Sequence, residues 1–110
     1  MREVKRPWGN FKQFALNKKC TVKIISINPN QSLSLQKHMK RDEEWYFLTS
    51  GYVEINNKER HVKKGERIFV SEGTKHRVFS KGKKVEVLEI SYGNFDEKDE
   101  IRIEDKYGRR

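Results

Sequence analysis

The chain contains one cysteine, two prolines and no long apolar run. Because Cys20 has no second cysteine to pair with, no disulfide can form within the chain, and nothing points to an oxidising compartment. No apolar stretch approaches the length of a membrane span, and residues 1–7 lack the apolar core of a signal peptide. These absences predict a cytoplasmic protein with no membrane partner.

Apolar residues are also scarce: they make up 34% of the 110 residues, whereas charged residues make up 37%. They nevertheless fall in short alternating runs, a pattern that disfavours disorder. A chain of this length forms one domain around a single core, and we expect that domain to span residues 1–110.

The charge balance is strongly basic, with 25 Lys and Arg against 16 Asp and Glu and a net charge of +9. Such a field attracts phosphorylated metabolites, nucleic acids and anionic membranes. The basic residues are mixed with acidic ones along the whole chain, without an aromatic RNA-binding motif or a basic helix, so we expect no nucleic-acid partner. A small anion is the favoured ligand; the alternative is a solvated surface rich in Lys and Glu.

Turn residues separate the apolar runs at regular intervals and predict about nine short strands. Residues 11–16 and 20–27 are expected to pair as a hairpin that follows a turn at residues 6–10. No segment has a convincing helical pattern, and residues 95–108 fit either a strand or a helical turn. The predicted fold class is therefore all-β, a barrel or a sandwich.

Side chains that can bind a metal alternate with leucines in the segment 32–39. In a strand, Leu33 and Leu35 would lie on one face. Gln36 and His38 would then lie together on the other face. The alternative is a half-buried edge strand whose polar face is in water.

Further ligand candidates follow this segment. A hairpin would bring Glu43 or Glu44 back beside it, and His76 lies further along the chain. Gln, His, Glu and His form a suitable shell for a borderline divalent metal that keeps open positions for substrate oxygens.

Two spacings in the chain resemble the two cupin motifs. The first has five, one and four residues between its members, which are Asn30, Gln36, His38 and Glu43. The second has five, one, two and three residues between its members, which are Gly65, Ser71, Gly73, His76 and Ser80. The resemblance implies a single cupin (RmlC-like jelly-roll) β-barrel whose metal ligands are Gln36, His38, Glu43 and His76.

A closer resemblance rests on the stretches RPWGNF, SLSLQKH followed by RDEEW, EGTKHR, and IRIEDKYGR. Over residues 6–109 the chain is similar to the C-terminal domain of type II mannose-6-phosphate isomerase/mannose-1-phosphate guanylyltransferase. This resemblance implies an aldose–ketose isomerase that interconverts mannose-6-phosphate and fructose-6-phosphate. It implies a divalent ion, with zinc expected and manganese, iron, cobalt or nickel as alternatives.

Two acidic residues compete for the same roles. Counting back from Gly51 selects Glu44 as the ligand, whereas the neighbours Arg41 and Trp45 favour Glu43. Either carboxylate is also a candidate for the base that moves the substrate proton. Basic residues beside the ligands are candidates for binding the phosphate: Arg41, Lys75 and Arg77.

Departures from the family pattern leave a second function open. Met39 and Lys40 stand where family members have histidines, and the Gly-rich nucleotide loop of the guanylyltransferase portion is absent. The alternative is a non-catalytic cupin that binds a sugar or sugar nucleotide and partners a separate guanylyltransferase.

An N-terminal strand ahead of the barrel and several apolar strand positions predict a homodimer that covers them. These positions, expected to be exposed, are Phe11, Phe14, Leu33 and Leu35.

Overall fold

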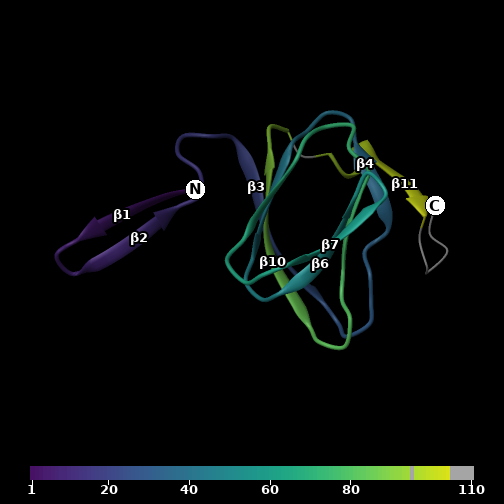
Figure 1. Ribbon diagram of the computed structural model, residues 1–110. Coiled ribbons are helices and arrows are strands. Elements are labelled where there is room, and N and C mark those ends of the chain that lie inside the picture. Colours follow the sequence, from purple (N-terminus) through teal and green to yellow (C-terminus); the bar gives the residue numbers. More distant parts are fainter. Residues whose placement is uncertain (95, 105–110) are drawn as a thin grey trace.

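Antiparallel strands make up almost all of the regular structure (Figure 1), as the sequence predicted. The computed structural model describes residues 1–94 and 96–104. The elements are β1 (Arg2–Arg6), β2 (Gly9–Gln13), β3 (Cys20–Ile27), β4 (Leu35–His38), β5 (Glu43–Phe47), β6 (Gly51–Ile55), β7 (Lys58–Val62), β8 (Arg67–Val70), β9 (His76–Phe79), β10 (Val85–Tyr92), the 3₁₀ turn η1 (Glu97–Asp99) and β11 (Glu100–Glu104).

Two sheets face each other, with strand orders β3-β10-β5-β8 and β11-β4-β9-β6-β7. The pairings are nested, because β3 pairs with β10, β4 with β9, β5 with β8 and β6 with β7. A long hairpin that folds over and alternates between two sheets produces this nesting, which is the jelly-roll topology.

The core fills the space between the two sheets. Trp45 and Phe47 from β5 are almost fully buried and pack with valines from both sheets, among them Val78 and Val85. A Cβ atom at Gly51 would lie 2.7 Å from Val85 Cγ1 and 2.8 Å from Phe47 Cε2. Packing this close leaves no room for a side chain at Gly51.

The N-terminal segment corrects the predicted strand pairing. β2 pairs with β1 instead of β3, and Pro7 and Trp8 form the turn between them. β3 pairs with β10 along its whole length. The charged sequence of β1 concealed it as a strand, so the nearest visible partner for β2 was the wrong one.

The segment before β4 corrects the predicted alternation. The strand covers only Leu35–His38, so the regular two-residue period does not extend back to Leu33. Leu33 therefore lines the same pocket as Gln36 and His38, and it packs partly against the core. Leu35 is 5% exposed. The prediction that Leu33 faces away from the ligands, and that both leucines are exposed, is wrong.

The tail combines both structures that the sequence allowed. Residues 97–99 form η1 and residues 100–104 form β11, while Phe95 and residues 105–108 lie outside the described residues. Within the described part of the chain, no helix has the length and apolar character needed to cross a membrane.

Candidate metal centre

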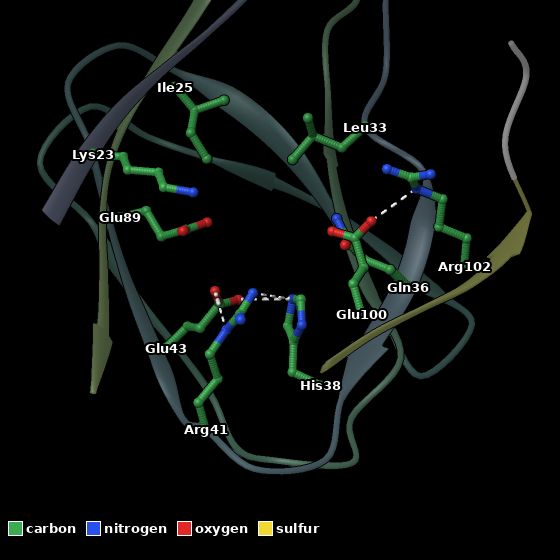
Figure 2. A pocket seen from close by; sticks show the side chains of 10 residues that line it. All are labelled: Lys23, Ile25, Leu33, Gln36, His38, Arg41, Glu43, Glu89, Glu100 and Arg102. Carbon is green, nitrogen blue, oxygen red and sulfur yellow. Dashed lines mark hydrogen bonds and ion pairs between the residues drawn. The ribbon is translucent and has the colours of Figure 1, made fainter. Parts of the chain in front are cut away.

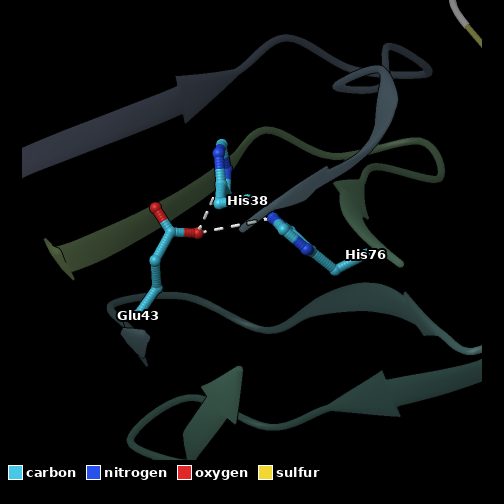
Figure 3. Close-up of side chains that lie close together, drawn as sticks. All are labelled: His38, Glu43 and His76. Atoms are coloured by element: carbon cyan, nitrogen blue, oxygen red, sulfur yellow. Dashed lines mark ion pairs between the residues drawn. The ribbon is translucent and has the colours of Figure 1, made fainter. Parts of the chain in front are cut away.

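Three potential metal ligands meet between the sheets (Figure 3). His38 ends β4, Glu43 begins β5 and His76 begins β9. Glu43 Oε1 lies 3.6 Å from His38 Nε2 and 3.4 Å from His76 Nε2. One potential ligand atom from each residue lies within 4.8 Å of the other two. This separation suits a single ion bound between them.

Gln36 lies beside the three. It is paired with His76 in the sheet register and is two positions before His38, so its side chain enters the same pocket. Gln36 Oε1 and Glu43 Oε1 are buried acceptors without a hydrogen-bond donor among the described residues. An unsatisfied buried acceptor costs about 1–3 kcal/mol. Two such oxygens next to two histidines fit a bound cation.

Both histidines present Nε2 to the centre. His76 Nδ1 lies 2.8 Å from the carbonyl oxygen of Thr74, so Nδ1 carries the proton and Nε2 keeps its lone pair. Arg41 Nη2 donates to His38 Nε2 at 3.2 Å, which again makes Nε2 an acceptor. His38 Nδ1 faces the Asp99 carbonyl oxygen at 3.4 Å. These outer contacts orient both rings.

The ionisation states also suit metal binding, which needs neutral histidine and ionised carboxylate. Burial lowers the pKa of His38, and the charges of Arg41 and His76 add to this effect although Glu43 opposes it. Burial would raise the pKa of Glu43, but His76, His38 and Ser91 together lower it to about 2.

Two of the three ligands, His38 and Glu43, line a cavity of about 340 Å³ together with Gln36 (Figure 2). Three cations line it, Lys23, Arg41 and Arg102. Three carboxylates line it as well, Glu43, Glu89 and Glu100. The cavity is therefore polar and lined by equal numbers of cations and carboxylates, which suits a polar, hydroxyl-rich ligand.

Sequence reasoning missed Glu89. It lies in β10 on the inner face, where Val87 and Ser91 also point, and it is 8% exposed. Burial, together with the charge of Glu43, raises the pKa of Glu89 to about 7. The available signal was a carboxylate that continues the buried apolar face of an alternating strand.

Glu44 does not reach this pocket. It follows Glu43 in β5 and therefore points to the other face of the sheet, where it accepts hydrogen bonds from Tyr46 at 2.6 Å, Tyr92 at 3.1 Å and Arg67 at 3.1 Å. This placement corrects the prediction that Glu44 is an alternative ligand or the base.

Two of the three expected phosphate-binding residues also point away. Lys75 and Arg77 flank His76 in sequence, so strand alternation turns them to the outer face. Lys75 is exposed, and Arg77 Nη2 lies 2.7 Å from Glu54 Oε1. Arg41 alone of the three lines the pocket, where its Nε lies 3.4 Å from Glu43 Oε2.

Two antiparallel sheets in jelly-roll order, with histidines and a glutamate gathered between them, define a cupin. A cupin protein from Bacteroides fragilis superposes with a TM-score of 0.63 at 15% sequence identity, over 74% of this chain and 72% of that one. The structural likeness establishes the fold.

The family follows from the sequence comparison. The family model described as "Mannose-6-phosphate isomerase C-terminal" matches residues 1–105. The chain belongs to this family of mannose-6-phosphate isomerase C-terminal domains, which confirms the predicted resemblance.

Two curated bacterial relatives match almost the whole chain. Mannose-1-phosphate guanylyltransferase ManC of Salmonella typhimurium is 33% identical over 98% of this chain and 23% of its own length. The xanthan biosynthesis protein XanB of Xanthomonas campestris is 34% identical over 98% of this chain and 24% of its own length. The chain thus spans about a quarter of the curated relatives that it matches.

Replacing Glu44 by Gln tests its placement. Burial would raise the pKa of Glu44, but the hydrogen bonds from Arg67, Tyr46 and Tyr92 outweigh burial and lower it below 4.5. The ionised side chain therefore stabilises the fold above this value, and its contribution is lost as the pH falls through the lowered pKa. Glu44→Gln should cost about 1–3 kcal/mol at neutral pH. The difference from the wild type should narrow in acid, as measured by urea unfolding.

The exposed Glu59 gives the matched control, because Glu59→Gln removes only a surface pair at 4.0 Å from Lys81. The metal content of the Glu44→Gln protein should equal that of the wild type. A loss of metal in this variant would place Glu44 in the site after all.

Proposed function

We propose that the chain is a metal-dependent isomerase that interconverts mannose-6-phosphate and fructose-6-phosphate in the supply of polysaccharide precursors. The observation that carries the proposal is the cluster of His38, Glu43 and His76 beside a polar pocket that contains three cations and three carboxylates. The family of mannose-6-phosphate isomerase C-terminal domains supports the same reaction. Because phosphorylated sugars are charged and do not cross membranes, we place the reaction in the cytoplasm.

The residues that would hold the ion are Gln36 through Oε1, His38 and His76 through Nε2, and Glu43 through Oε1. A set of nitrogen and oxygen donors favours zinc, and manganese, iron, cobalt or nickel are the alternatives. When bound, a divalent ion polarises the carbonyl and hydroxyl oxygens of the sugar and makes the neighbouring C–H bond more acidic.

Binding of the phosphate is assigned to Lys23 and Arg102. Both line the pocket, on strands β3 and β11. Arg102 Nε lies 2.7 Å from Glu100 Oε2, so the two side chains form an ion pair in the cavity. A dianionic phosphate would form charge-assisted hydrogen bonds with such groups. Arg41 instead contacts His38 and Glu43, and we assign it to orienting these ligands.

A non-catalytic sugar-binding cupin is the second candidate, and one observation favours it. Arg41 already supplies a cation beside His38 Nε2 and Glu43, as a metal-free binding site would require. The presence of Met39 and Lys40, where family members have histidines, gives little support to a non-catalytic function. Met39 and Lys40 are exposed, and their backbone amides donate to the Asp99 carboxylate at 3.1 and 3.0 Å instead of facing the pocket.

We also infer a homodimer. The β1–β2 hairpin extends away from the two facing sheets (Figure 1), and Trp8 at its tip is 73% exposed. An isolated two-stranded hairpin is only marginally stable in water. β3 is an edge strand, and it exposes Val22 by 55% and Ile24 by 60%. A second copy of the chain would cover both features.

A coupled assay tests the isomerase. With metal, the wild type should produce fructose-6-phosphate from mannose-6-phosphate, and a chelator should abolish turnover. His76→Ala should lose both the ion and the activity, because it removes one of the ligands. The exposed His61 provides the control, since His61→Ala leaves the cluster intact. Binding of mannose-6-phosphate without turnover, unchanged by chelator, would support the non-catalytic alternative instead.

Sedimentation tests the dimer. The wild type should sediment as a dimer at micromolar concentration, and Ile24→Lys should shift it towards the monomer by placing a charge in the apolar contact. Ile101→Lys is the matched control, because Ile101 is 46% exposed on the other sheet. A wild type that is monomeric in this range contradicts the inference.

A further inference from the structure

Glu89 is a buried carboxylate on a strand face that otherwise carries only uncharged side chains. It lies on the inner face of β10 between Val87 and Ser91, where an apolar side chain would cost less to bury. Figure 2 shows its carboxylate pointing into the cavity, across from Gln36 and His38. A charged group kept in this position needs a functional explanation.

The other two carboxylates that line the cavity each have a close charged or ring partner. Glu43 contacts both histidines, and Glu100 contacts Arg102 at 2.7 Å. Glu89 Oε1 lies 3.3 Å from Ser91 Oγ, and the charges of Lys23 and Arg41 also act on it. The same hydroxyl donates its proton to Glu43 Oε2 at 2.9 Å, so Ser91 lies between Glu89 and the ligand cluster.

The surroundings of Glu89 also suit a reacting sugar. Its cross-strand neighbour is Lys23, which lines the cavity as well. A sugar phosphate whose oxygens approach the ligand cluster and whose phosphate approaches the cations would lie between the two walls. Its C1–C2 edge would then face Glu89, on the wall opposite Gln36 and His38.

We propose that Glu89 is the catalytic residue that moves the proton between C2 and C1 of the sugar phosphate. This assignment rests on the proposed isomerase function. The sequence offered Glu43 and Glu44 as candidates for the base, both on β5. Glu43 contacts the ligand histidines and Glu44 points out of the pocket, so the role passes to Glu89 on β10.

The reaction moves one proton between two neighbouring carbons of the sugar. The Glu89 carboxylate takes the proton from C2 of the open-chain aldose, and the electron pair of that C–H bond forms the C1–C2 double bond while the C1 oxygen gains a proton from water. Glu89 then returns its proton to C1, and the C2 hydroxyl releases its proton to water as it becomes the carbonyl. The oxidation of C2 balances the reduction of C1, so no further reactant is needed.

The experiment compares Glu89→Gln with the wild type in the intact, metal-loaded chain. Removal of a proton-transfer group should lower kcat by about 10²–10⁴-fold. Because Gln has nearly the same shape as Glu, the metal content should match that of the wild type and the melting temperature should change by only a few degrees. The affinity for mannose-6-phosphate, measured by calorimetry, should stay within about threefold of the wild type. In D₂O the wild type should place deuterium at C1 of fructose-6-phosphate, and the variant should lose this exchange together with turnover.

Two further variants make the result specific. Glu89→Asp keeps the carboxylate and should retain more activity than Glu89→Gln. Glu86→Gln, on the outer face of the same strand, should match the wild type in every readout.

The outcomes separate the two proposals. An active wild type with a Glu89→Gln variant that turns over within threefold of it, or that exchanges deuterium normally, overturns the role of Glu89 and leaves the isomerase standing. A metal-loaded wild type with neither turnover nor exchange overturns both.

Discussion

The structure depends on a buried negative charge. Glu43 is almost fully enclosed, and an isolated carboxylate in such a place would be strongly destabilising. Here His38, His76 and Ser91 contact it from β4, β9 and β10. The carboxylate thus joins both sheets at one point. The same charge that would destabilise an empty core makes this point a place where a cation is stabilised.

The jelly-roll pairing explains why these residues meet. Nested pairing places β5 next to β10 in one sheet and β4 next to β9 in the other, although the strands are far apart in sequence. The ligand-bearing side chains then converge from both sheets, while Lys23 and Glu89 line the part of the cavity formed by β3 and β10. This division gives the cavity one wall suited to holding sugar oxygens and another that carries a further carboxylate.

Much of the fold was predictable because strand alternation and turn residues are local signals. β5 to β10 follow them closely. Strand alternation and the expected hairpin, together with the resemblance to the cupin motifs, predicted that Gln36, His38, Glu43 and His76 cluster. The errors arose where local pattern and tertiary placement differ. The β1 strand was hidden by its charge, and the irregular backbone at Ser34 brought Leu33 to the pocket.

The errors in the site have one physical cause. Glu44, Lys75 and Arg77 were chosen because they neighbour ligands in sequence, yet in a strand a direct neighbour points to the opposite face. Glu89 was missed for the complementary reason. Its position two residues from Ser91 and Val87 gives it the correct face, but only the pairing of β10 with β3 and β5 brings that face to the ligands.

We propose that His38, Glu43 and His76 bind one divalent ion, and the site depends on this ion. Anomalous diffraction at the zinc edge, from crystals grown with zinc, tests it most directly. We expect one strong peak at bonding distance from His38 Nε2, Glu43 Oε1 and His76 Nε2, with Gln36 Oε1 completing the shell and Arg41 moved off His38. An absence of anomalous density at this position, with Arg41 still in contact with His38 and Glu43, would contradict it.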